Sequence, residues 1–148
     1  MNTIKKDPQP KVEIDKFIYN PIIIWHKPDS LKIMRIELDE NHTRIDFIHY
    51  ADPKYKNGGW VRINANTYIR PMGTDTELRL IKVLNIPIAP NVHNYKSKND
   101  CLYFTLYFPA LSSDVKKIDI TEEGNINPFR FRGVSVSKIK TKAIIIKN

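Results

Sequence analysis

The residues of this sequence that could carry chemistry are few and scattered. The four histidines stand far apart, in different sequence contexts: His26, His42, His49 and His93. None belongs to an H-x-H or HExxH pattern or to a His/Cys pair, the spacings that usually bring metal ligands together. We therefore expect no metal site.

Cys101 is the only cysteine, which rules out an internal disulfide and any multi-cysteine metal site. A reactive thiol would need a neighbouring base, and no residue of the sequence is indicated for that role. Cys101 precedes the apolar run Leu102-Tyr103-Phe104, so we expect it to be a small buried hydrophobic side chain.

Adjacent carboxylates occur at Asp39-Glu40 and at Glu122-Glu123, both beside turns, where such pairs are usually solvated. The sequence has no glycine-rich phosphate loop, since Asn57-Gly58-Gly59 indicates only a tight turn, and no G-x-S-x-G elbow. It therefore names no catalytic residue, no metal ligand and no cofactor, and it does not identify the residues of a binding site. We expect a protein that is not an enzyme.

The net charge of +8 raises the alternative of a nucleic-acid-binding domain. The run Phe129-Arg130-Phe131-Arg132 interleaves rings and cations, as RNA-binding sheets do. However, the basic residues are spread from Lys5 to Lys147 without a block, which favours a solvated lysine surface. A nucleic-acid partner remains the second interpretation.

Residues 1–20 are polar, contain Pro8 and Pro10, and end at Asn20-Pro21, so they are expected to form an extended arm before a single domain over 21–148. No apolar segment follows Lys5-Lys6, as a secretion signal would require. A cytoplasmic protein and a trimmed form of an exported one are both consistent with this start. The longest apolar runs are of strand length, so no membrane span is expected.

Short alternating stretches predict β-strands along the rest of the chain. Residues 31–38 and 43–50, joined by the polar segment 39–42, predict a hairpin, with Met34, Ile36 and Leu38 on one face of its first strand. Further strands are predicted at 60–63, 67–70, 102–108, 117–120 and 129–136, with a long polar loop over 86–100. Residues 77–84 fit either a helix or a strand, and the neighbouring Gly73 and Pro87 favour a strand.

This pattern predicts an all-β, antiparallel domain of seven to nine strands, closed as a sandwich or a barrel. The residues expected to be largely buried are Trp60, Leu106, Phe108, Ile118 and Phe131.

In the C-terminal segment 138–148, lysines occupy every second position at Lys138, Lys140 and Lys142, and the three isoleucines Ile144 to Ile146 follow before the final Lys147-Asn148. Lysines on one face suit an edge strand, whereas the isoleucines are unsuited to water. We expect residues 138–146 to pair with the domain's own sheet or with a second copy, which would make an oligomer. The alternative is a frayed end.

Over residues 20–136 the order of features resembles an immunoglobulin-like β-sandwich module of secreted and envelope proteins of Bacteroidetes, often found N-terminal to thioredoxin-like domains. The matching features are Asn20-Pro21, the strand 31–38, the tryptophan strand 59–63 with its short partner 67–69, and the segments 104–111, 117–124 and 129–136. Ala110 replaces a proline of the family pattern, and the loop 86–100 lacks its usual glycine.

The resemblance implies an immunoglobulin-like sandwich and an extracytoplasmic location, periplasmic or at the cell surface. Together with the sandwich pattern and the absence of a recognisable site, the resemblance leads us to expect a non-catalytic interaction or accessory module of the bacterial envelope with a protein or glycan partner. It carries over no functional residue.

Overall fold

The computed structural model describes residues 16–124 and 127–137. The regular elements of these residues are β-strands, and they include no helix. One sheet has five strands in the order β1-β3-β4-β10-β8. The bounds of these strands are Lys16–Tyr19 (β1), Leu31–Leu38 (β3), His42–Tyr50 (β4), Cys101–Pro109 (β10) and Lys82–Leu84 (β8). We call it the first sheet.

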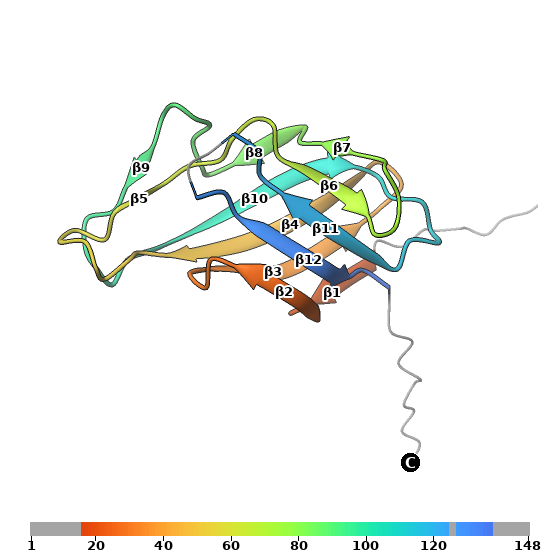
Figure 1. The fold of residues 1–148 in the computed structure, drawn as a ribbon, viewed down its shortest axis with the longest axis horizontal. Coiled ribbons are helices and arrows are strands. Elements are labelled where there is room, and N and C mark those ends of the chain that lie inside the picture. The colour runs from red at the N-terminus through yellow and green to blue at the C-terminus, as the bar shows by residue number, and fades with distance from the viewer. Residues whose placement is uncertain (1–15, 125–126, 138–148) are drawn as a thin grey trace, which may run out of the picture.

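The second sheet also has five strands, in the order β2-β12-β11-β6-β7. Its strands are Ile23–Lys27 (β2), Arg130–Ser135 (β12), Lys117–Thr121 (β11), Tyr68–Pro71 (β6) and Leu78–Arg79 (β7). A two-stranded ribbon of Trp60–Val61 (β5) and His93–Asn94 (β9) lies at one end of the long axis (Figure 1). All named strands pair antiparallel, as predicted.

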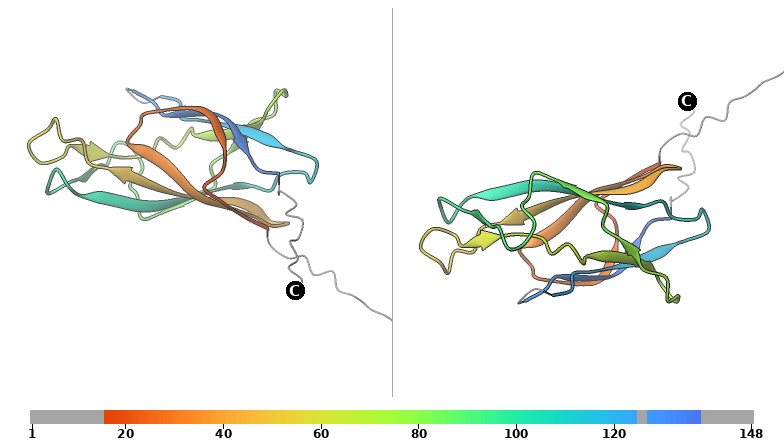
Figure 2. Two further views of the ribbon diagram at one scale, coloured as in Figure 1. Left: turned by 90° about the horizontal axis from the view of Figure 1, so that it is seen from below. Right: turned by 90° about the horizontal axis from the view of Figure 1, so that it is seen from above.

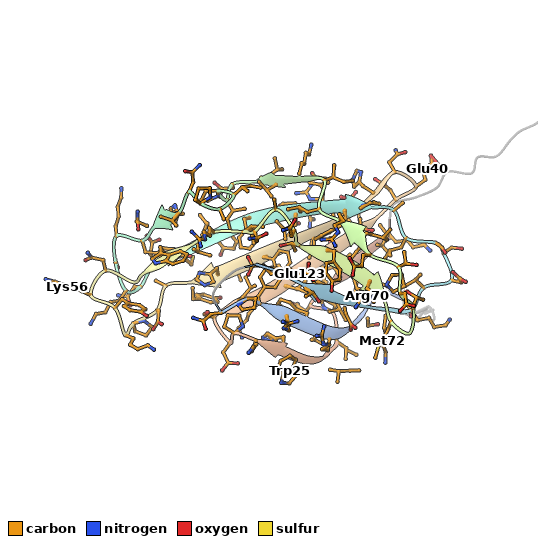
Figure 3. The ribbon with its side chains drawn as sticks, turned by 45° about the horizontal axis from the view of Figure 1, so that its top comes forward. Trp25, Glu40, Lys56, Arg70, Met72 and Glu123 are labelled. Carbon is orange, nitrogen blue, oxygen red and sulfur yellow. The ribbon has the colours of Figure 1, made fainter. Side chains whose placement is uncertain are left out.

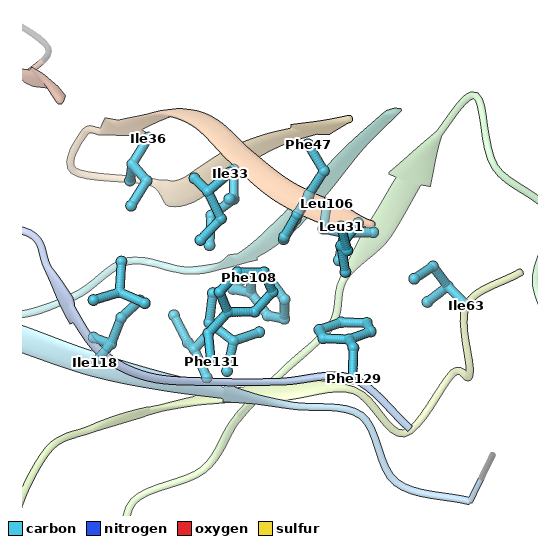
Figure 4. Close-up of a cluster of buried hydrophobic side chains, with 14 of the residues drawn as sticks. Leu31, Ile33, Ile36, Phe47, Ile63, Leu106, Phe108, Ile118, Phe129 and Phe131 are labelled. Atoms are coloured by element: carbon cyan, nitrogen blue, oxygen red, sulfur yellow. The ribbon is translucent and has the colours of Figure 1, made fainter. Parts of the chain in front are cut away.

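The two five-stranded sheets lie one above the other and enclose a hydrophobic core, so the architecture is sandwich-like (Figures 2 and 4). Alternation explains the core, because each strand turns every second side chain inward. The predicted core residues Leu106, Phe108, Ile118 and Phe131 are fully buried. Phe47 stacks on Phe104 with ring centroids 5.0 Å apart.

Trp60 is the exception among the predicted core residues, since 49% of its surface is exposed. The chain from Trp60 to Ile63 is extended, and Ile63 is the residue turned into the core, with 1% exposure. Side chains alternate along extended backbone, so Trp60 and Ile63 cannot both face inward. The Arg62 guanidinium lies over the Trp60 ring, 4.9 Å from its centre, on the outer side.

Met34 was predicted to share a face with Ile36, but 39% of its surface is exposed while Ile36 is fully buried. The register between β3 and β4 shifts between Ile33 and Arg35, which marks a bulge around Met34. A bulge inserts one unpaired residue and reverses the alternation beyond it. As a result Ile33 and Ile36, three positions apart, both face the core.

The predicted hairpin of residues 31–38 and 43–50 is confirmed as the β3–β4 pair. The described residues contain twelve strands, so the predicted number of seven to nine was too low. Part of the surplus is β1 and β2, of four and five residues, which were not predicted as strands. The rest comes from pairings of two or three residues, which carry no periodicity that a sequence pattern can show. Residues 77–84, for example, form two short strands, β7 and β8, and the chain passes from the second sheet to the first between them.

The predicted arm of residues 1–20 ends in β1, which pairs with β3 along the edge of the first sheet. The remainder of the arm and the C-terminal segment 138–148, with its predicted strand, lie outside the described residues. Within the described parts of the chain, there is no helix long and apolar enough to cross a membrane.

Candidate functional site

The outer face of the first sheet carries two rows of polar and aromatic side chains. Antiparallel register places outward-facing residues of neighbouring strands side by side. One row runs across all five strands: Tyr19, Arg35, Asp46, Thr105 and Leu84. The next row is Phe17, Glu37, Arg44, Tyr107 and Lys82. On this outer face, aromatic rings thus lie toward both edges of the sheet, with charged groups between them.

A hollow of about 460 Å³ opens on this face. That volume lies in the range of small-molecule sites. Tyr19 and Tyr103, with 62% and 56% of their surfaces exposed, belong to its lining. The complete lining is Tyr19, Asn20, Met34, Arg35, Arg44, Asp46, Phe47, Leu84, Asn85, Tyr103, Phe104 and Thr105.

Asp46 of β4 organises the floor of the hollow. Its Oδ1 accepts hydrogen bonds from Thr105 Oγ1 at 2.6 Å and from Arg44 Nε at 3.1 Å, and its Oδ2 accepts one from Arg35 Nε at 2.6 Å. Burial by itself would raise the pKa of this carboxyl, but the hydrogen bonds from Thr105, Arg35 and Arg44 outweigh it and lower the pKa. Asp46 is therefore ionised at neutral pH and holds two guanidinium groups in place.

The bulge at Met34 and the loop after β8 complete the hollow. Because the bulge turns Met34 outward, its side chain joins the lining instead of the core. The Asn85 side-chain amide donates to the Tyr103 carbonyl oxygen, which ties the loop after β8 to β10. Two cations lie over the neighbouring Tyr107 ring, Lys82 at 4.7 Å and Arg44 at 5.8 Å from its centre.

The histidines are only partly brought together. The His49 and His93 rings both pack on buried Tyr95, with ring centroids 5.8 Å and 5.1 Å from its own. The Tyr95 hydroxyl lies 2.8 Å from His49 Nδ1 and donates to the His49 carbonyl oxygen at 3.1 Å. Burial lowers the pKa of His49 to about 4, against a smaller opposing effect of Asp52. His49 is thus held neutral, which makes it a structural group and a poor base near neutral pH.

The other two histidines lie elsewhere. His26 stacks on Phe131 in the second sheet, and His42 packs edge-on against Tyr107. The residues in 16–124 and 127–137 contain no group of three or more potential ligands close enough to hold a metal ion.

The carboxylates beside turns have structural contacts. Asp39 accepts hydrogen bonds from the backbone of Asn41 and His42 and so caps the β3–β4 turn. Glu122 was predicted to be solvated, but only 3% of its surface is exposed. Its two oxygens accept hydrogen bonds from the backbone N–H groups of Asn64 and Phe129, and these bonds offset the cost of burying the carboxyl group.

The run from Phe129 to Arg132 does not form a nucleic-acid platform. Phe129 and Phe131 are 5% and 0% exposed and belong to the core, so their rings cannot stack on bases. Cys101, at the start of β10, is only partly buried.

Sequence reasoning missed the residues around Asp46 as a site. The signal available in the sequence was the set of outward-facing side chains of two strongly alternating strands. These are Arg44 and Asp46 in β4, and Tyr103, Thr105 and Tyr107 in β10. The pairing of β4 with β10 places these side chains next to one another, and the sequence of either strand alone does not predict that pairing.

No family model matches this chain, and no curated protein or solved structure matches it.

Proposed function

We propose that this protein is a non-catalytic binding module of the bacterial cell envelope that holds a glycan chain in the hollow of the first sheet. The observation that carries the proposal is the hollow itself, with the exposed rings of Tyr19 and Tyr103 in its lining and the Asp46 cluster at its floor. Sugars have apolar C–H faces that pack on aromatic rings, and hydroxyl groups that both donate and accept hydrogen bonds.

The polar groups of the hollow suit hydroxyl-rich ligands. The ionised Asp46 carboxylate holds Arg35 and Arg44, whose guanidinium groups bring donors with an orientation set by their hydrogen bonds to it. Groups that are held in place before binding lose little conformational entropy when a ligand arrives. The site is therefore organised to recognise a polar ligand.

The same contacts support a role without catalysis. The hydrogen bonds that lower the pKa of Asp46 also occupy its oxygens, so this carboxylate is suited to orienting donors and not to transferring protons. The envelope location and the immunoglobulin-like type of the sandwich rest on the resemblance of residues 20–136. Fractionation of cells that express the full gene tests the location.

Substitution of a lining ring tests the glycan proposal. After a glycan array identifies a ligand, Tyr103→Ala should weaken its binding at least tenfold by calorimetry, because an exposed stacking ring is lost. Tyr50→Ala is the matched control, since Tyr50 is also an exposed tyrosine of this sheet, at 43%, and lies outside the hollow. Equal affinities of the two variants, or no glycan bound at all, would refute the proposal; a protein ligand that depends on Tyr103 would replace it.

The competing function is nucleic-acid binding, and it is favoured by the cations beside rings on this same face, Arg44 and Lys82 at Tyr107. Base stacking together with phosphate contacts uses this mixture of side chains. Fluorescence anisotropy with labelled single- and double-stranded oligonucleotides at two salt concentrations separates the two functions. Tight binding with a steep salt dependence would establish the nucleic-acid function in place of the glycan one.

A further inference from the structure

Two turns at one end of the molecule form a basic surface that the hollow does not use. Residues 52–59 join β4 to β5, and residues 95–100 join β9 to β10. They lie in contact: a Cβ added to Gly58 would be 2.6 Å from the Ser97 carbonyl oxygen. We call these two turns the lysine tip. Figure 3 shows Lys56 at this end of the long axis, and Glu40 and Met72 toward the other.

The lysine tip carries four lysines, all exposed: Lys54, Lys56, Lys96 and Lys98. None of them forms an ion pair with another described residue. The two acidic residues of the tip, Asp52 and Asp100, are half-buried and accept hydrogen bonds from the backbone N–H groups of Lys54 and Cys101. The outer surface of the tip is therefore positive.

Hydrogen bonds fix the two turns before any partner arrives. Asp52 N donates to the Gly58 carbonyl oxygen at 2.8 Å, and Gly58 N donates to that of Tyr55 at 3.0 Å. Tyr95 N donates to the Gly59 carbonyl oxygen at 2.9 Å, which links one turn to the other. Like charges held close together repel one another, and a negatively charged partner removes that cost.

Two exposed aromatic residues accompany the lysines. Tyr55 lies within the tip and is 56% exposed, and Trp60, the residue that follows the first turn, is 49% exposed. The Lys54 ammonium lies 5.8 Å from the centre of the Tyr55 ring. Tyrosine and tryptophan combine an apolar ring with a polar group, and in membrane proteins they gather at the level of the lipid headgroups.

We propose that the lysine tip docks on an anionic phospholipid surface. Lysine is a compact point charge that binds phosphate without a fixed geometry, which suits a fluid layer of headgroups. The tip is the narrow end of the molecule (Figure 1), so it can approach a flat surface without hindrance from the sheets. Each lysine near such a surface contributes about a fivefold increase in binding. Docking in this way leaves the hollow of the first sheet, on the side of the molecule, open to its own ligand.

Co-sedimentation with lipid vesicles tests the proposal with two vesicle types, phosphatidylcholine alone and phosphatidylcholine mixed with phosphatidylglycerol. The protein should bind the mixed vesicles and not the neutral ones, and added salt should weaken binding. The double variant Lys56→Ser/Lys98→Ser should bind at least tenfold more weakly. The matched control is Lys116→Ser/Lys117→Ser, which removes the same charge from exposed positions at the Met72 end of the molecule.

A fluorescence measurement reports on the orientation of the bound protein. Trp25 and Trp60 are the only tryptophans, so Trp25→Phe leaves Trp60 as the sole indole. Its emission should shift to shorter wavelength on mixed vesicles, because the ring enters a less polar layer. Binding that does not depend on phosphatidylglycerol, equal losses in the two double variants, or an unshifted Trp60 emission would each overturn the proposal. So would tight binding of a labelled oligonucleotide by the lysine tip without binding to vesicles.

Discussion

Acidification should destabilise the protein through His49, between about pH 6.5 and pH 4. Burial lowers the pKa of His49 from 6.5 to about 4 in the folded chain. As the pH falls below 6.5, the unfolded chain takes up a proton at this position and the folded chain does not. The free energy of unfolding therefore decreases with falling pH until the folded-state pKa is reached. At about 1.4 kcal/mol per pKa unit, this gives a loss of about 2 kcal/mol between pH 7.5 and pH 5.

Urea unfolding of the wild type and of His49→Gln at pH 7.5 and pH 5 measures this contribution. The difference between the losses of the wild type and the variant separates the contribution of His49 from that of His26, whose pKa is also lowered by burial. Measurements at pH 5 and above avoid the titration of Asp46, whose pKa is likewise lowered. Nuclear magnetic resonance of the His49 ring gives the folded-state pKa directly. A ring that titrates near pH 6.5, or an equal loss of stability in the wild type and the variant, would refute the reasoning.

Three further substitutions test packing and the backbone, and all are measured by urea unfolding at neutral pH. Phe108→Ala should cost about 3–5 kcal/mol, because this ring is fully buried. Trp60→Ala should cost about 1 kcal/mol or less, since half of the side chain is already in water; similar losses at the two positions would show that the burial of one is wrongly assigned. Gly58→Ala should cost more than about 1 kcal/mol, because its φ of 93° disfavours a side chain and the new Cβ would meet Ser97 and Ala51. An unchanged midpoint for Gly58→Ala would mean that the two turns of the lysine tip are not held together as described.

Local pattern was sufficient for the long strands β3, β4 and β10. The alternation in residues 43–50 and 102–108, and the polar segment between residues 38 and 43, led to the correct strands and the correct hairpin. The burial of Leu106, Phe108, Ile118 and Phe131 was also predicted correctly. These features depend on which side chains prefer water and on the two-residue period of a strand, and both are properties of a short stretch of chain.

Tertiary structure decided which side of each strand faces the core, and which strands lie next to each other. Trp60 and Met34 show the first point: alternation alone does not reveal that Ile63 is the inward residue, or that a bulge reverses the faces of β3. The hollow shows the second, because Tyr19, Arg35, Asp46 and Thr105 come from four strands and meet only through the register of the sheet. Register is set by contacts between residues far apart in the chain. The sequence of each strand therefore determines which side chains it contributes to this surface, and the pairing of the strands brings those side chains together in one site.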